Sequence, residues 1–285
     1  MKNKKIQISI SAGKVITFTI SQLILIILAI MSLFPFVWML ASSLKTNAEM
    51  FQFPPKIFPE IPQWSNYPKV FESVNFGQAF INSMKLAVIN TIGQVLTSAM
   101  CGYALGKLKF KGSNLLFSGF IGVMMVPYTV IVIPIFAMFS KLGLIDSHLG
   151  IILMTFAYMP MGVFLCRQFI MSLPNELFDA AIIDGASYLR IFFTIVIPLI
   201  KPAIASLAVF SFLWNWNSYF TPMIFLTSPE NFTVPLTLQM FKGKHSADWS
   251  LIMAASSISV LPVLIVYMFG QNYIVEGITI TGMKS

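Results

Sequence analysis

Long apolar segments with almost no charge dominate this chain. A helix needs about 20 apolar residues to cross the hydrocarbon core of a bilayer. Six segments reach that length, near residues 16–41, 80–105, 115–139, 150–170, 203–226 and 251–271. Inside hydrocarbon every backbone polar group must be bonded within the protein, and a helix does this within one segment. The sequence therefore predicts an all-α membrane protein with six transmembrane helices in contact with membrane lipid.

The composition leads to the same fold class. Hydrophobic residues make up 57% of the 285 residues and charged residues only 10%, whereas a soluble domain carries about 25% charged residues. The apolar runs are continuous, so they lack the alternating pattern of a membrane β-barrel. Six spans use most of the chain and leave no room for a large soluble domain. We expect residues 1–15 to form an N-terminal segment and residues 16–285 a single transmembrane domain.

Lysine and arginine in short loops indicate the orientation, because they gather on the cytoplasmic side of a membrane. The basic residues that share one side by parity are Lys2, Lys4, Lys5, Lys14, Lys107, Lys109, Lys111, Arg167, Arg190 and Lys201. On the other side, acidic residues dilute the lysines. The loop 171–202, the tail 277–285 and both termini are therefore predicted to be cytoplasmic, and the loops 43–79 and 227–250 external. The net charge of +8 then reflects topology, and no basic run interleaved with aromatics indicates nucleic-acid binding.

The sequence carries no motif of an enzyme or of a metal site. Cys101 and Cys166 lie in or at the end of apolar spans without a second cysteine or a histidine nearby, so we expect small buried side chains rather than redox or metal chemistry. A GxxxxGK[ST] loop, which holds ATP phosphates, is missing from the sequence. We therefore expect no catalysis and no cofactor in this chain.

The loop 171–202 stands out as a polar interruption between two apolar runs. Pro174 suits a first helical turn, where its missing N–H costs nothing. Glu176 and Asp179 follow near the positive end of that helix. Three residues at the spacing of one helical face make that face mostly small: Leu177, Ala180 and Ala181. The pattern predicts a short helix held between two spans.

The pair Asp184-Gly185 is predicted to break this helix, because glycine readily adopts the left-handed conformation of a helix cap. A second helix should follow, with one apolar stripe made by Leu189, Phe192, Phe193, Val196 and Ile197. Pro198 and Pro202 are expected to end it. A short helix that presents two alanines from a loop is suited to docking into a groove of another protein.

This loop resembles the cytoplasmic EAA loop of bacterial ABC importer permeases. The matching residues are Asp179, Ala180, Ala181, Asp184, Gly185, Ala186, Phe192 or Phe193, Ile195, Pro198 and Pro202. Asp179 replaces the usual glutamate and keeps its charge. Further stretches, at 102–112, 132–150, 212–236 and 272–285, resemble the carbohydrate-uptake branch of these permeases, in particular the smaller permease subunit of maltose and multiple-sugar importers.

The resemblance implies a bacterial cell-membrane permease that works with three partners: a second permease subunit, an ATPase dimer that binds ATP, and an external sugar-binding protein. It implies that the loop couples to the ATPase through Glu176, Asp179, Ala180, Ala181, Asp184, Gly185 and Ala186. It also implies that the loop 227–250 reaches toward the binding protein. The tail 277–285 either extends into the ATPase dimer or forms a flexible end.

A polar and aromatic patch lies inside the fifth expected span. Its members are Trp214, Asn215, Asn217 and Tyr219. Aromatic rings and amides suit sugars, so the patch is a candidate for the substrate path. The same side chains can instead hydrogen-bond between helices of a bundle, and both interpretations stay open.

Two mechanisms of transport compete. Ion-coupled secondary transporters of small polar solutes usually place acids, bases or histidines inside their spans. The spans here are almost free of such groups, and Lys85, the exception, lies about one turn into the second span, where it can extend outward. The sequence therefore favours a sugar importer driven by a separate ATPase, with the ion-coupled carrier as the alternative.

Overall fold

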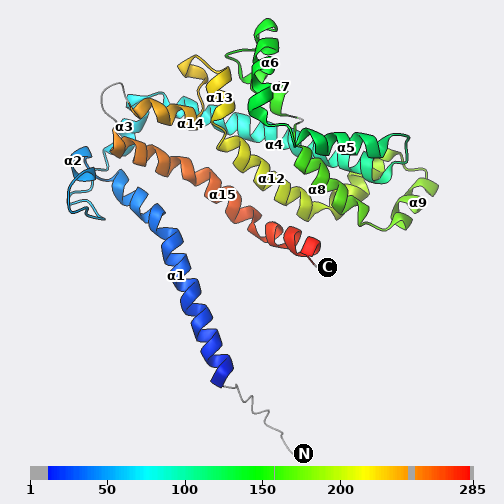
Figure 1. Cartoon of the computed structure of the whole chain (residues 1–285), viewed down its shortest axis with the longest axis horizontal. Helices are drawn as coiled ribbons and strands as arrows, with labels where there is room; N and C mark the ends of the chain where they lie inside the picture. Colours follow the sequence, from blue (N-terminus) through cyan, green and yellow to red (C-terminus); the bar gives the residue numbers. More distant parts are fainter. Residues whose placement is uncertain (1–11, 157, 243–247, 283–285) are drawn as a thin grey trace, which may run out of the picture.

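The computed structural model describes residues 12–156, 158–242 and 248–282, and these residues form helices without any strand. The all-α prediction is confirmed. Three helices are longer than 30 residues: α1 (Ala12–Ser43), α4 (Phe76–Lys107) and α15 (Trp249–Gly282). The predicted N-terminal segment 1–15 lies mostly outside the described residues. Figure 1 shows α4 and α15 running along the long axis of the bundle, while α1 projects away from it.

The centre of the bundle is formed by α4, α8 (Pro160–Met171) and α12 (Lys201–Trp216). The backbones of α4 and α8 approach closely because small residues line their contact. A Cβ added at Gly102 would lie 2.8 Å from the Cβ of Cys166, and one at Gly162 would lie 2.4 Å from the hydroxyl of Ser98. Packing through small residues is the usual way in which membrane helices associate. Cys166 is buried in this contact, as expected for a small apolar side chain.

The predicted span at 115–139 is not one straight helix. The segment forms α5 (Ser113–Val123) and α6 (Tyr128–Lys141), which meet at an angle of 98°. Pro127 precedes α6 with an extended backbone. Because proline restricts the residue before it to extended conformations, Val126 cannot continue the first helix.

The predicted span at 203–226 is also interrupted. α12 ends at Trp216, and a separate short helix, α13 (Phe220–Phe225), follows. Asn217 and Ser218 fall at the break, where short polar side chains compete with the helical backbone, and Pro222 lacks the N–H that a continuous helix needs. The sixteen residues of α12 span about 24 Å, less than the hydrocarbon core.

The expected span at 150–170 is formed by α7 (His148–Thr155) and α8. By length and composition, four helices of the described chain could cross a membrane, and six spans result if each of two bent pairs counts as one. The second bent pair joins Tyr188–Leu199 to α12 at 82°. The count of six is therefore compatible with the structure, although two of the spans are not straight helices.

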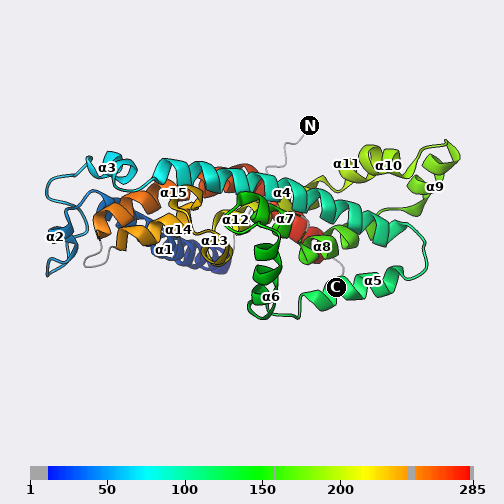
Figure 2. The same ribbon diagram turned by 90° about the horizontal axis from the view of Figure 1, so that it is seen from above.

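The predicted external loops meet at one end of the bundle. The loop 43–79 contains α2 (Asn47–Met50) and α3 (Asn66–Ser73), and the loop 227–250 contains η2 (Pro229–Asn231), α14 (Val234–Thr237) and η3 (Leu238–Lys242). One apolar cluster joins them: Val70, Phe76, Ala79, Val234, Phe241, Leu251, Ala254 and Ala255. Figures 1 and 2 show α9 (Asn175–Ile183) at the opposite end of the bundle.

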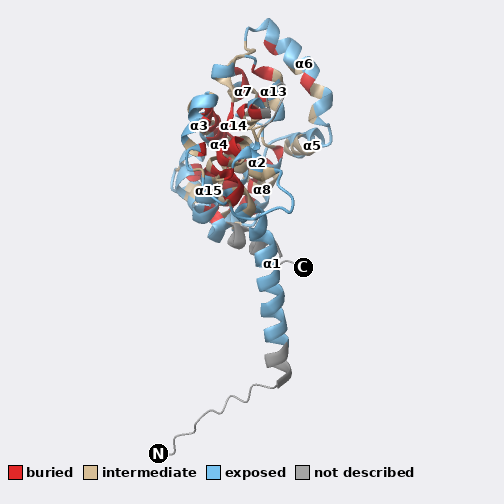
Figure 3. Cartoon of the chain, turned by 90° about the vertical axis from the view of Figure 1, so that its left-hand side faces the viewer, coloured by how far each residue is buried: buried red, intermediate tan, exposed pale blue. Residues whose placement is uncertain are grey.

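A flexible end was one of the two interpretations of the tail 277–285. α15 continues as a helix to Gly282, so most of the segment 277–285 is helical, and only residues 283–285 lie outside the described part. At the other end of the chain, Figure 3 shows α1 exposed over most of its length. None of its most apolar stretch is buried within the chain, so this surface is free for lipid or a second subunit.

Candidate functional site

The first helix of the loop 171–202 ends in a glycine cap, as predicted. α9 stops at Ile183, and Gly185 has a φ of +76°. The Gly185 N–H donates to the Ile182 carbonyl at 3.0 Å, and the Ala186 N–H donates to the Ala181 carbonyl at 2.9 Å. These two bonds make a Schellman motif, in which a left-handed residue satisfies the last carbonyls of the helix. Pro174 lies at the N-cap of α9, one position before the first turn.

The second helix of the loop is composite. It consists of α10 (Tyr188–Ile191), a π-helical turn at Phe192–Val196, and α11 (Ile197–Leu199). This helix ends at Leu199, between the two prolines that were predicted to end it and one residue after Pro198. Pro202 belongs to the next helix. It lies in the first turn of α12, where a missing N–H is tolerated.

The predicted single apolar stripe on this second helix is divided between two faces. Phe192 and Val196 are buried, whereas Leu189 and Phe193 are 62% and 57% exposed. Leu189 and Phe193 are four residues apart, as are Phe192 and Val196, so each pair lies on its own face of the helix. One face therefore packs on the bundle, and the other is exposed in this chain.

Phe178 anchors α9 to the bundle. Its ring is buried and stacks on Tyr103 of α4 with centroids 6.2 Å apart. The Lys107 ammonium lies 4.8 Å from the centre of the Phe178 ring. The Lys107 Nζ also donates to the Leu173 carbonyl and to Asn175 Oδ1, both at 2.7 Å. The loop is thus fixed to the last turn of α4 by one ring and one ammonium group.

Sequence reasoning missed both anchors. Of the helical face that it selected, Leu177 and Ala180 are exposed, and only Ala181 is partly buried. Phe178 and Ala181 have the same three-residue spacing on the neighbouring face, and they pack inward on one cluster. The spacing of apolar residues is compatible with burial of either face. Only the larger apolar side chain of Phe178 indicates which face is buried.

The residues expected to couple to the ATPase divide accordingly. Glu176, Asp179, Ala180, Asp184 and Gly185 are exposed. Ala181 and Ala186 are partly buried and pack against the cluster around Phe178. Beside the exposed group lie apolar side chains that this chain leaves uncovered: Leu177, Ile182 and Ile183, the last of them 85% exposed. The arrangement offers a small apolar helix to another molecule.

The candidate substrate patch also divides. Asn215 is half-buried, and its Nδ2 donates to Gln94 Oε1 at 3.0 Å and to the Ser211 carbonyl at 2.8 Å. By contrast, Trp214 is 78% exposed. Among the residues that the structure describes, the Asn217 amide donates only to the Leu213 carbonyl of the preceding helical turn, at 2.8 Å. Tyr219 is partly exposed. Asn215 therefore serves packing, and the other three side chains are exposed in this chain.

Gln94 is a further polar residue that the sequence analysis did not select. Its amide donates to the Thr155 carbonyl at 2.9 Å, at the break between α7 and α8, while its Oε1 accepts from Ser211 and Asn215 of α12. One side chain of α4 thus provides a hydrogen-bond donor for a free carbonyl at the helix break and also holds α12 in place. A lone glutamine in the middle of a long apolar span was the available signal.

At the opposite end of the bundle, Asp146 ties two loops together. Its carboxylate accepts hydrogen bonds from the backbone N–H groups of Thr227 and Ser228 at 3.0 Å, from the Ser228 hydroxyl, and from Asn231 Nδ2 at 3.2 Å. The Ser228 bonds, and then that from Thr227, hold the pKa of Asp146 well below its ordinary value of 3.8. In the described residues no group of three His, Cys, Asp or Glu side chains could hold a metal.

Asp146→Asn should destabilise these loops by about 2 kcal/mol, because hydrogen bonds to a charged acceptor are the stronger ones and solvent screens part of the effect. Asparagine tolerates the left-handed backbone of this position, where φ is 56°, so the loss reports the charge. The folded-state pKa is lowered, so the carboxylate stabilises the fold above pH 3.8 and this contribution disappears as the pH falls further. Thermal unfolding in detergent at several pH values measures it. A mutant with the wild-type acid sensitivity would contradict this role.

The comparisons with known proteins agree with one another. A family model described as "Binding-protein-dependent transport system inner membrane component" matches residues 98–280. The chain is 35% identical over 266 residues to the arabinooligosaccharides transport system permease protein AraQ of Bacillus subtilis (strain 168), covering 92% of this chain and 94% of that one. It is 30% identical to the melibiose/raffinose/stachyose import permease protein MelC of the same organism, covering 96% and 99%.

Two solved structures are similar as well. One is a bacterial ABC transporter involved in the import of the acidic polysaccharide alginate, with a TM-score of 0.81 and 25% identity over 93% of this chain and 98% of that chain. The other is the bacterial alginate ABC transporter in complex with alginate pentasaccharide-bound periplasmic protein, with a TM-score of 0.52 and 17% identity over 90% and 92%. The second supports the fold alone.

Proposed function

Because the chain belongs to the family of binding-protein-dependent transport system inner membrane components, we propose that it forms half of a sugar pathway and that a separate ATPase drives it through the loop 171–202. The chain itself is a multi-pass membrane permease of a carbohydrate-uptake ABC importer, and it is a transport component rather than an enzyme. The alternative of an ion-coupled secondary transporter is rejected by this family membership.

The observation that carries the coupling proposal is the exposed helix α9 on a buried anchor. Phe178 and Lys107 fix one face of α9 to α4, while Ile183 on another face is left 85% exposed. A short rigid helix with an uncovered apolar face is the form that docks in a groove. Movement of a docked ATPase would pass through the anchor into α4 and the bundle. ATP is bound by that partner, and this chain binds no cofactor.

The other partners are a second permease subunit and an extracytoplasmic sugar-binding protein. The uncovered apolar length of α1 supports contact with a second membrane subunit. The loops 43–79 and 227–250 share a core at the end of the bundle remote from α9, which suits a binding protein that docks opposite the ATPase. The related permeases transport oligosaccharides, so a small oligosaccharide is the proposed substrate class.

The exposed part of the polar patch is proposed to line the sugar path. Asn217→Ala should lower sugar uptake several-fold and change the order of preferred sugars, while basal ATP hydrolysis persists. Asn215→Ala is the matched comparison, because its amide is used in packing. That variant should lose stability, on the order of 0.6 kcal/mol for one interhelical bond, with the same sugar preference. Competitive uptake assays on both variants decide, and an unchanged preference in Asn217→Ala would exclude the residue from the path.

The proposed orientation has α9 inside the cell. Single cysteines at Ser65, Glu230 and Ser187, all exposed positions, can be introduced after Cys101 and Cys166 are replaced by alanine. An impermeant thiol reagent added to intact cells should label the first two and spare the third. Labelling of all three after the cells are opened is the control for reactivity. If the cysteine at position 187 reacts in sealed cells, the orientation is reversed.

The complete proposal is tested by purifying the chain together with the subunits that accompany it. Oligosaccharides are then screened for stimulation of ATP hydrolysis in the presence of the binding protein. Stimulation by a sugar only with both the binding protein and this chain present supports the assignment. Hydrolysis that no combination of sugar and binding protein changes would contradict it.

A further inference from the structure

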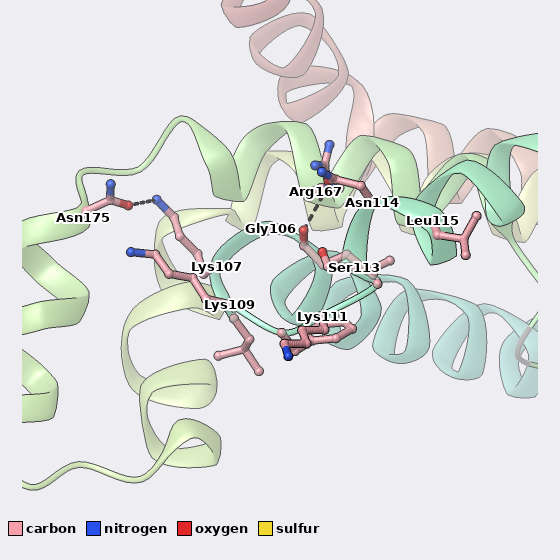
Figure 4. Close-up of a pocket in the computed structure, with 13 residues that line it drawn as sticks. Gly106, Lys107, Lys109, Lys111, Ser113, Asn114, Leu115, Arg167 and Asn175 are labelled. Carbon is pink, nitrogen blue, oxygen red and sulfur yellow. Dashed lines mark hydrogen bonds between the residues drawn. The ribbon is translucent and has the colours of Figure 1, made fainter.

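A basic hollow lies where α4 ends and α5 begins, beside the base of α9. It is widely open to solvent, has a volume of about 670 Å³ and is lined by the turn from Leu105 to Leu115 together with Arg167 and Asn175. This volume is within the range of about 300–1,000 Å³ that small-molecule sites occupy. In Figure 4 the side chains of Lys107 and Lys109 extend toward Asn175, and Arg167 lies on the other side of the turn.

The charges of this hollow are all positive. Its lining holds three lysines and one arginine and no acidic side chain. Two of the four are already engaged: Lys107 holds the base of α9, and Arg167 donates to the Leu105 carbonyl at 3.1 Å and lies over the Phe117 ring at 4.0 Å. Lys109 and Lys111 are exposed and have neither a hydrogen bond nor an ion pair to any residue that the structure describes. They are available for an anion.

Apolar side chains also lie beside these lysines. Leu108 and Phe110 alternate with them along the turn, and the adjoining start of α5 exposes Leu115 and Leu116 by 78% and 55%. A free anion needs only the charges, whereas a lipid needs charges next to an apolar surface. In the proposed orientation the hollow also lies at the cytoplasmic end of α4, a candidate membrane-spanning helix. Basic pockets of this kind on the cytoplasmic side of spans bind anionic headgroups.

We propose that this hollow binds the phosphate headgroup of an anionic phospholipid, with Lys109 and Lys111 on the headgroup and α5 along an acyl chain. The bound lipid would fill the space between the start of α5 and the base of α9. This site is separate from the sugar path and from the exposed face of α9.

The test uses the purified permease complex, delipidated in a nonionic detergent, with the double variant Lys109→Gln/Lys111→Gln. Binding of labelled phosphatidylglycerol is compared with that of labelled phosphatidylcholine. The double variant should bind phosphatidylglycerol roughly tenfold more weakly at this site, because each lysine near a headgroup contributes measurably, and binding of phosphatidylcholine should not change. The matched control is Lys69→Gln/Lys141→Gln, which removes two exposed lysines outside the hollow and should leave both affinities at their wild-type values.

Three results would overturn the proposal. The first is equal phosphatidylglycerol binding by the two double variants. The second is full displacement of the lipid by millimolar inorganic phosphate, which would make the hollow a site for a free anion. The third is loss of the ATPase subunits from the lysine variant during size-exclusion chromatography in lipid-free detergent, which would assign Lys109 and Lys111 to a protein contact.

Discussion

Replacing Gly185 with valine should abolish ATP-driven sugar uptake while the chain still folds and inserts. Gly185 has a φ of +76°, and a Cβ placed there would meet no atom of this chain within 4 Å. The folded state is therefore destabilised only by the backbone strain of valine in the left-handed region, which costs about 1–2 kcal/mol. The larger effect comes from a changed direction of the loop after α9 and from bulk on the docking face. Uptake into cells that contain equal amounts of the permease measures it.

The chain provides a matched control for this variant. Gly143 caps α6 with the same Schellman bonds, from Gly143 to Ser140 and from Leu144 to Phe139, at a φ of +67° and with equally open space. Gly143→Val therefore introduces the same strain far from α9 and should keep most of the uptake. If the two variants lose sugar uptake equally, the loss results from altered folding, and Gly185 has no specific role in coupling.

Phe178→Ala should detach α9 from the bundle and uncouple ATP hydrolysis from sugar. Removing a buried phenyl ring costs about 3–5 kcal/mol where the site cannot collapse, and here the ring also loses its contacts with Tyr103 and Lys107. Amide hydrogen exchange in α9 should accelerate roughly 100-fold, which corresponds to the lower end of that range. Basal ATP hydrolysis should persist, but the sugar-loaded binding protein should no longer stimulate it.

Leu177→Ala is the comparison for the anchor. Leu177 neighbours Phe178 on the same helix but is 42% exposed, so its truncation should leave the exchange rates of α9 close to those of the wild type. If Phe178→Ala exchanges as slowly as Leu177→Ala, the ring does not hold the loop, and transmission from α9 to α4 must take another route.

Local chemistry made the glycine cap predictable. Asp184-Gly185 follows a short helical pattern, and a left-handed glycine is the usual end of such a helix. The same holds for the six apolar segments and for the all-α fold, because the bilayer leaves few alternatives. These features depend on residues that are adjacent in sequence, and they needed no knowledge of tertiary contacts.

Which helical faces are buried, and where the spans are interrupted, could not be predicted, because both depend on contacts between residues that are distant in the sequence. Nothing near Phe178 in the sequence indicates that Tyr103 and Lys107 cover it. The Thr155 carbonyl at the break after α7 is satisfied by Gln94, 61 residues away. Likewise Asn215 and Asn217 are of one residue type in one patch, and only the presence of Gln94 beside the first distinguishes packing from exposure.

Uptake into sealed proteoliposomes tests the central claim most directly. The vesicles contain this chain with its co-purified subunits, ATP is trapped inside, and the binding protein with labelled sugar is added outside. We expect uptake that requires ATP, stops when vanadate is trapped with it, and continues when an ionophore dissipates the ion gradients. Uptake that proceeds without ATP and stops with the ionophore would contradict an ATPase-driven permease.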